Sequence, residues 1–129
     1  MPLLRFDVIE GRTKGELVQL LDAAHEAMLA AFGVPERDRY QVIQEHKAYL
    51  LHIEDTGLGI ERSEKVVVLQ VTARQRSAEQ KQEFYRLLSE RLYNVCGRPN
   101  DIVVSFSENG DAVWSLGQGE AQFLTGRLG

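Results

Sequence analysis

The stretch LLRFDVIEGRTKGELVQLLDAAHEAMLAAFGVP, residues 3–35, has a second copy in VVLQVTARQRSAEQKQEFYRLLSERLYNVCGRP, residues 67–99. The two copies align without a gap, and the pairs that match best are Arg12 with Arg76, Thr13 with Ser77, Gly33 with Gly97 and Pro35 with Pro99. After one deleted residue the match continues, with DRYQVIQE at 38–45 opposite DIVVSFSE at 101–108. An internal repeat of this length indicates one supersecondary unit that occurs twice.

Each copy predicts a strand, a helix and a second strand. Each copy opens with an apolar stretch that is typical of a strand, and a second such stretch follows later in the copy. The predicted strands are Leu3 to Ile9, Val66 to Thr72, Tyr40 to Ile43 and Ile102 to Phe106. Between them, apolar residues recur at helical spacing from Leu17 to Phe32 and from Phe84 to Val95. Each unit is therefore expected to be a β-α-β unit with parallel strands and a right-handed crossover.

The expected helix ends carry matching signals. Thr13 and Ser77 occupy N-cap positions, and an acidic or amide residue follows three positions later, which predicts two capping boxes. Gly33 and Gly97 are expected to end the helices as C′ glycines.

Together the units predict an α/β fold with a four-stranded mixed sheet and two helices on one face. We expect a single domain over residues 1–129, with the repeat covering about 2–45 and 66–108. Two helices can cover only one face of such a sheet, so the other face predicts an oligomer.

Composition narrows the class of protein. The chain of 129 residues is 43% hydrophobic and 26% charged, as in soluble globular proteins, and its formal net charge is −4. That charge argues against nucleic acid or an anionic membrane as partner. Without a signal peptide or a long apolar run, we expect a cytoplasmic protein. The single cysteine, Cys96, ends an apolar helical stripe and is expected to be buried filler.

Two arginines are the first candidates for chemistry. Arg74 and Arg76 lie in ARQRS, between the third strand and its helix. Residues two apart on a strand point the same way, so both guanidiniums could bind one carboxylate. Two solvated surface charges are the simpler interpretation of the same residues.

Pro2 and Asp38 are further candidates, each with a plain structural alternative. Removal of Met1 would leave Pro2 with a free secondary amine, a group that can act as acid, base or nucleophile near neutral pH. Asp38 precedes the second strand, where aspartate is usually a turn residue. His25, His46 and His52 show no metal-ligand spacing, so no metal site is expected.

Two segments lie outside the repeat, residues 46–65 and the tail from 109 onward, and insertions of this kind often carry sites. The tail's apolar residues are candidates either for packing or for the wall of a site: Trp114, Leu116, Phe123 and Leu128.

In these features the chain resembles the tautomerase superfamily, and within it the malonate semialdehyde decarboxylases. The similarity rests on PLLRFDVIEGRT, FGVPERDRYQ, EDTGLGIERS, ARQRSAEQK and WSLGQGEAQFLTG, which span nearly the whole chain. The resemblance implies a homotrimer and a small anionic carboxylic acid as substrate, with no cofactor. It places catalytic roles on Pro2, Asp38, Arg74 and Arg76 and a hydrophobic wall on Trp114, Leu116, Phe123 and Leu128. Leu116 departs from the phenylalanine expected there.

The activity implied is decarboxylation of a small 3-oxo acid, malonate semialdehyde giving acetaldehyde and carbon dioxide. The arginines would bind the carboxylate, Pro2 would supply the electron sink, and Asp38 would orient Pro2 or help to hold its proton. The alternatives are a tautomerase or hydratase of an enol or unsaturated acid, with a dehalogenase-like branch as a weaker match, and a non-catalytic trimeric binding protein. The protonation state of Pro2 separates the enzymatic branches, and the sequence does not give it.

Overall fold

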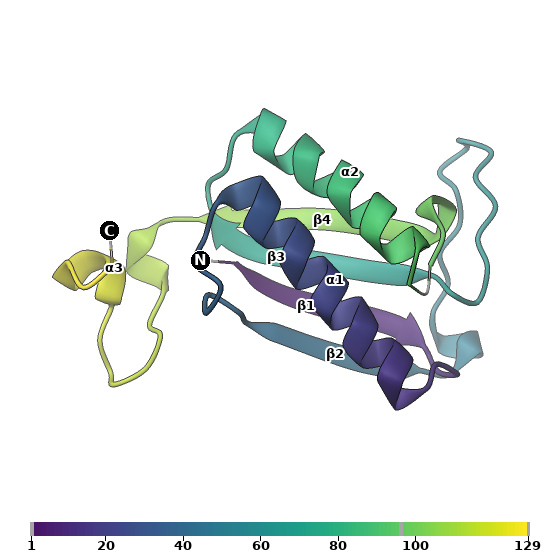
Figure 1. Ribbon diagram of the computed structural model, residues 1–129, viewed down its shortest axis with the longest axis horizontal. Coiled ribbons are helices and arrows are strands. Elements are labelled where there is room, and N and C mark those ends of the chain that lie inside the picture. The colour runs from purple at the N-terminus through teal and green to yellow at the C-terminus, as the bar shows by residue number, and fades with distance from the viewer. Residues whose placement is uncertain (1, 96, 129) are drawn as a thin grey trace.

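A computed structural model describes residues 2–95 and 97–128, so the expectation for Cys96 lies outside the described residues. The elements follow the predicted order (Figure 1). The strands are β1 (Leu3–Ile9), β2 (Gln41–His46), β3 (Val67–Arg74) and β4 (Ile102–Asn109), and the main helices are α1 (Lys14–Phe32) and α2 (Ala78–Tyr93). Short helical turns complete the chain: η1 (Ala48–Leu50), η2 (Pro99–Asp101), η3 (Asp111–Val113) and α3 (Gln122–Thr125).

The four strands form one mixed sheet in the order β2-β1-β3-β4. Within each β-α-β unit the strands are parallel, and the two units meet through the antiparallel pair β1 and β3. This confirms the predicted α/β fold, its mixed sheet and its two main helices.

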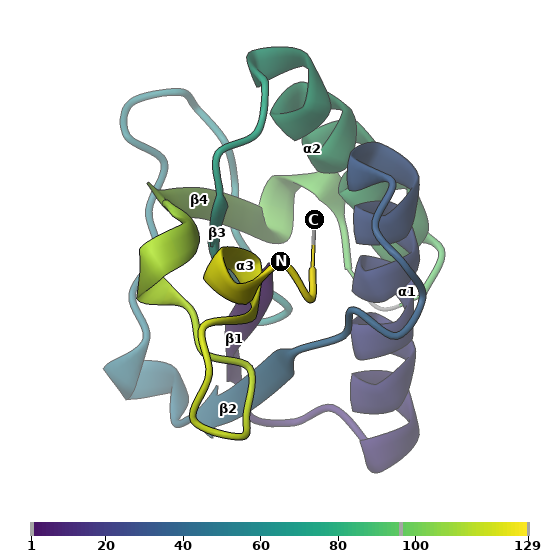
Figure 2. The same ribbon diagram turned by 90° about the vertical axis from the view of Figure 1, so that its left-hand side faces the viewer.

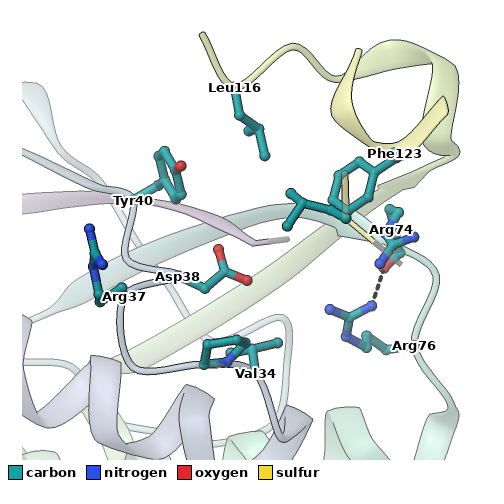
Figure 3. A pocket seen from close by; sticks show the side chains of 10 residues that line it. Val34, Arg37, Asp38, Tyr40, Arg74, Arg76, Leu116 and Phe123 are labelled. Carbon is teal, nitrogen blue, oxygen red and sulfur yellow. Dashed lines mark hydrogen bonds between the residues drawn. The ribbon is translucent and has the colours of Figure 1, made fainter. Parts of the chain in front are cut away.

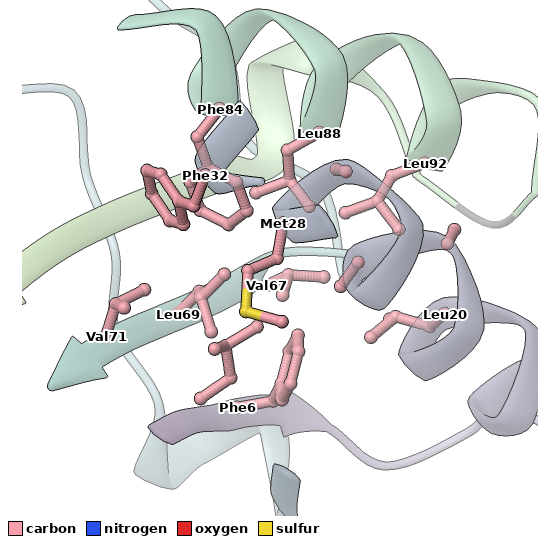
Figure 4. Packing of buried hydrophobic residues seen from close by; sticks show 14 of the residues in the cluster. Phe6, Leu20, Met28, Phe32, Val67, Leu69, Val71, Phe84, Leu88 and Leu92 are labelled. Atoms are coloured by element: carbon pink, nitrogen blue, oxygen red, sulfur yellow. The ribbon is translucent and has the colours of Figure 1, made fainter. Parts of the chain in front are cut away.

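Both main helices pack on the same face of the sheet (Figure 2). The core between these helices and the sheet is apolar. Its members Phe6, Leu69, Phe84 and Leu88 are fully buried (Figure 4). Across the opposite face runs one row of paired residues, Val42, Arg5, Gln70 and Ser105, and all of them are exposed. In the described chain, the expected open face is therefore present.

The helix starts follow the predicted rules. Thr13 and Ser77 each accept a hydrogen bond from the backbone N–H three residues on, and Glu16 and Gln80 return the bond, so both capping boxes are confirmed. Gly33 ends α1 in the left-handed conformation, with φ of 64°. The expectation for Gly97 was wrong, because α2 already ends at Tyr93 and is capped by Asn94 in a right-handed conformation.

The gapless alignment of the two copies matches the starts of the two helices but not the strands. The alignment pairs even-numbered residues of β1 with even-numbered residues of β3, and the structure does not follow this pairing. Side chains that point to the core are even-numbered on β1, such as Phe6, and odd-numbered on β3, such as Leu69. The connection before α1 covers residues 10–13, and that before α2 covers only 75–77, because β3 extends to Arg74. The predicted end of this strand at Thr72 was therefore too early, and the extra length carries Arg74 to the edge of a cavity.

Candidate active site

Four parts of the chain meet at one end of the sheet. Since β1 and β3 are antiparallel, the start of β1 lies beside the end of β3. The start of β2 joins them because β2 is parallel to β1, and the tail joins them because β4 is parallel to β3. The topology thus places Pro2, Asp38, Arg74 and the tail at the same end.

A cavity of about 350 Å³ opens at this end (Figure 3). The residues that line it come from the segment before β2, from the end of β3 and from the tail: Val34, Pro35, Arg37, Asp38, Tyr40, Arg74, Arg76, Leu116, Phe123 and Leu128. Most of this wall is apolar, and the polar groups are three arginines, one carboxylate and one phenol. Such a cavity suits a small ligand with a localised negative charge.

Arg74, the last residue of β3, is held by the tail. Its Nη1 donates to Asp111 Oδ1 at 3.0 Å, and its guanidinium carbon lies 3.9 Å from the centre of the Phe123 ring. A cation over an aromatic face is attracted by the ring's quadrupole. Phe123 therefore both walls the cavity and orients the arginine.

Arg76 follows the strand, and its backbone rather than its side chain is firmly fixed. The Arg76 N–H donates to Glu108 Oε2 at 2.7 Å, whereas Nη1 makes only long contacts of 3.4 Å to the carbonyl oxygens of Arg74 and Gln75. Burial, and next the charge of Arg74, lower the pKa of Arg76. Two cations held together in a partly buried site favour an anion beside them.

Both guanidinium groups keep donors free within the described residues. The Nε atoms of Arg74 and Arg76 are buried and have no hydrogen-bond partner among residues 2–95 and 97–128. Within the same residues, Nη2 of either arginine makes no hydrogen bond or ion pair, so each group keeps a terminal donor for a ligand. The pair is therefore poised to accept a carboxylate.

Asp38 faces the same cavity from a short turn. Its N–H donates to the Pro35 carbonyl at 2.9 Å, and His25 of α1 donates from Nε2 to the Glu36 carbonyl at 2.8 Å. Burial raises the pKa of Asp38, while the charges of Arg76, His25 and Arg74 oppose that rise. The carboxylate thus lies within electrostatic reach of the arginine pair.

Pro2 is buried directly before β1. The next residue, Leu3, pairs with Thr72 on β3, and the N–H of Leu4 donates to the Tyr40 carbonyl at 2.9 Å. Pro2 therefore lies at the end of the sheet that carries the cavity, although it is not among the residues that line it.

The tail supplies one wall through a buried amide. Gln122 is 8% exposed; its Oε1 accepts from the Leu116 N–H at 2.9 Å and its Nε2 donates to the Gly117 carbonyl at 2.7 Å. These bonds hold Leu116 over the cavity. Trp114 is not among the lining residues, and its indole donates to Asn109 Oδ1 at 2.6 Å instead.

Sequence reasoning did not single out Val34, Pro35, Arg37 or Tyr40 as part of the site. All four lie in GVPERDRY around Asp38. Because the chain turns there rather than extending, neighbours of Asp38 also reach the cavity, and the turn signal itself could have suggested them.

The described residues contain no group of three or more histidine, cysteine or acidic side chains arranged to hold a metal ion. Among the same residues, no helix has the length and apolar character needed to cross a membrane.

Comparison with known families assigns the class. Two sequence models described as a tautomerase enzyme match the chain, one over residues 38–117 and one over residues 2–61. The chain belongs to the tautomerase superfamily.

Individual relatives are similar over almost their full length. Probable tautomerase YrdN of Bacillus subtilis (strain 168) is 56% identical over 129 residues, which cover 99% of this chain and 100% of the relative. A solved malonate semialdehyde decarboxylase, described with decarboxylase and hydratase activities, is 52% identical with a TM-score of 0.96, and the match covers 98% of each chain.

A second solved enzyme, FG41 malonate semialdehyde decarboxylase inhibited by 3-bromopropiolate, is 33% identical with a TM-score of 0.95, covering 98% of this chain and 97% of that one. A fused 4-OT, described as a symmetric trimer, is 20% identical with a TM-score of 0.79, covering 97% and 99%, and shares the fold.

Proposed function

We propose that this protein decarboxylates a small 3-oxo acid without a cofactor, with malonate semialdehyde as the reference substrate. The observation that carries the proposal is the pair of guanidinium groups that line an apolar cavity opposite Asp38, each with an Nη2 that is unpaired within residues 2–95 and 97–128. The similarity to malonate semialdehyde decarboxylase over 98% of both chains supports the same reaction.

Arg74 and Arg76 bind and orient the substrate carboxylate. Charge-assisted hydrogen bonds from guanidinium to carboxylate are strong and directional, and they position the acid so that its carbonyl faces the amino end of β1. The apolar wall of Val34, Leu116 and Phe123 keeps water away from the reacting carboxylate.

Pro2 supplies the electron sink once Met1 has been removed. Its protonated amine hydrogen-bonds to the substrate carbonyl oxygen, or its free amine condenses with that carbonyl to an iminium, releasing water. The bond between C1 and C2 then breaks, carbon dioxide leaves, and the electron pair forms an enol or enamine. Protonation at C2, followed by hydrolysis where an iminium formed, yields the aldehyde.

Asp38 orients Pro2 and stabilises its positive charge. A carboxylate near an amine favours the protonated form of that amine. Because burial raises the pKa of Asp38, the group can also accept a proton more readily than an exposed aspartate.

Tautomerisation of an enol acid is the second candidate. It would use the same arginines with Pro2 as a neutral base, and the 56% identity to a protein named probable tautomerase favours it. A hydratase of an unsaturated acid, a dehalogenase-like activity and a non-catalytic binding protein are further alternatives, with less support from the cavity.

A homotrimer is part of the proposal. The face with Arg5, Val42 and Gln70 is exposed in the single chain, and the fused 4-OT with the same fold is described as a symmetric trimer. Three sheets that face a common centre would cover this surface. Light scattering of the purified protein tests it, with three chains per particle expected and a monomer as the contrary result.

The test of the reaction is a direct product assay. Incubation with malonate semialdehyde should release carbon dioxide and acetaldehyde in equal amounts. Ketonisation of an enol acid without release of carbon dioxide would favour the tautomerase. Absence of both reactions would favour the non-catalytic binding protein.

A further inference from the structure

The cavity is larger than a three-carbon acid requires, and a second hollow adjoins it. Its volume of about 350 Å³ would hold roughly ten water molecules. A second hollow of about 710 Å³ shares Arg37, Tyr40, Leu116 and Leu128 with it and extends toward Gln118, Gln122 and Arg127. Substrate bound at Arg74 and Arg76 would therefore leave space on the far side.

A third cation lies on that far side. Figure 3 shows Arg37 beside Tyr40, across the cavity from Arg74 and Arg76. Its side chain is exposed, and within residues 2–95 and 97–128 its guanidinium makes no ion pair or hydrogen bond. The other cation of the second hollow, Arg127, already binds Gln118 and Glu120. Arg37 is thus the guanidinium in this region with its donors free for a ligand.

Building on the proposed function, we propose that the site takes 3-oxo acids that carry a second carboxylate at the far end of the chain. The 3-oxo carboxylate binds Arg74 and Arg76, the carbon chain passes Tyr40 and Leu116, and the distal carboxylate binds Arg37. Decarboxylation of 3-oxohexanedioate would break its C1–C2 bond, release carbon dioxide and place a proton on C2, giving 4-oxopentanoate. Arg37 is a specificity residue in this scheme, distant from the bond that breaks.

The decisive comparison uses two acids of equal length. Values of kcat/KM for 3-oxohexanedioate and 3-oxohexanoate are measured as carbon dioxide release above the uncatalysed rate. A charge-assisted pair predicts a preference of about tenfold for the diacid. Arg37→Gln should bring the ratio of the two values close to one. A wild-type ratio near one, or an unchanged ratio in Arg37→Gln, would overturn the inference.

Arg39→Gln is the matched control. Arg39 lies in the same turn but is engaged by Asp22 at 2.7 Å and by Gln41 at 2.9 Å, and it lines neither hollow. The same change of charge at this position should preserve the diacid preference. Loss of the preference in Arg39→Gln as well would show a general effect of charge and would contradict a specific role for Arg37.

A binding experiment separates this inference from the proposed function. Calorimetry compares hexanedioate with hexanoate, neither of which can be decarboxylated by this route. If no 3-oxo acid is turned over but hexanedioate binds about tenfold more tightly than hexanoate, and Arg37→Gln removes the difference, the proposed reaction fails and the diacid site stands. Equal affinities of the two ligands would contradict the site itself.

Discussion

Replacing Arg76 by glutamine should abolish most activity while leaving the fold intact. The side chain contributes little to stability, since its hydrogen bonds are two contacts of 3.4 Å and its stacking partner Phe32 lies 5.3 Å away. Such a cation–π contact is worth about 0.5–1 kcal/mol. Burial and the charge of Arg74 both disfavour the charged guanidinium and lower the pKa of Arg76, so its removal also removes these two unfavourable effects. We therefore expect the free energy of unfolding to change by less than about 1 kcal/mol.

The effect on catalysis should be much larger. A hydrogen bond to a charged group is worth about 1.5–3 kcal/mol, and the guanidinium can make two to one carboxylate. Allowing for non-additivity, a loss of about 3 kcal/mol corresponds to a fall in kcat/KM of roughly a hundredfold. Urea unfolding and the malonate semialdehyde assay measure the two quantities on one preparation.

Arg91→Gln provides the control. Arg91 binds Glu26 at 2.9 Å between the two helices, away from the cavity, so this substitution removes an equal charge and should leave kcat/KM unchanged. Near-normal turnover by Arg76→Gln would refute the carboxylate-binding role. A large loss of stability in Arg76→Gln would show that the side chain is structural.

Three further substitutions test the account. Asp38→Asn should lower activity and raise stability at neutral pH, because burial raises the pKa of Asp38 and its ionised form therefore destabilises the fold. This gain should shrink as pH falls through the raised pKa and be absent below the ordinary pKa of aspartate, which urea unfolding at several pH values will show. Asp101→Asn should cost about 2 kcal/mol, because buried Asp101 accepts the N–H and the hydroxyl of Ser63, each at 2.7 Å. Burial opposes ionisation of Asp101, yet its bonds hold its pKa below the ordinary value, so this stability should be lost as pH falls through that lowered pKa, and a pH-independent cost would contradict the assignment. Gln122→Leu should free Leu116, seen as faster amide exchange in the tail and a lower kcat/KM, and unchanged exchange would argue against it.

Features of the fold that depend on neighbouring residues were predictable from the sequence. Helix periodicity, the capping boxes at Thr13 and Ser77 and the left-handed Gly33 each depend on contacts within a few residues. The end of α2 and the length of β3 were missed, because both depend on how the chain packs onto the sheet rather than on local preference.

The residues themselves suggested Arg74, Arg76, Pro2, Asp38 and part of the tail as candidates, and the resemblance gave them their roles. The turn signal around Asp38 is the one local hint for Arg37 and Tyr40, and it does not show that they reach a cavity, because the other wall comes from the tail. Trp114 was expected in the wall because it is an apolar residue of the tail. In the structure its indole N–H donates to Asn109, and it is not among the residues that line the cavity.

The most direct test asks whether the reaction requires the free amine of Pro2. Protein shown by intact mass to begin at Pro2 is mixed with malonate semialdehyde, and the release of carbon dioxide is compared with that of the same chain retaining Met1, whose Pro2 nitrogen is an amide. The account predicts turnover only when Pro2 is the first residue. Equal rates for the two forms, or no carbon dioxide from either, would contradict it.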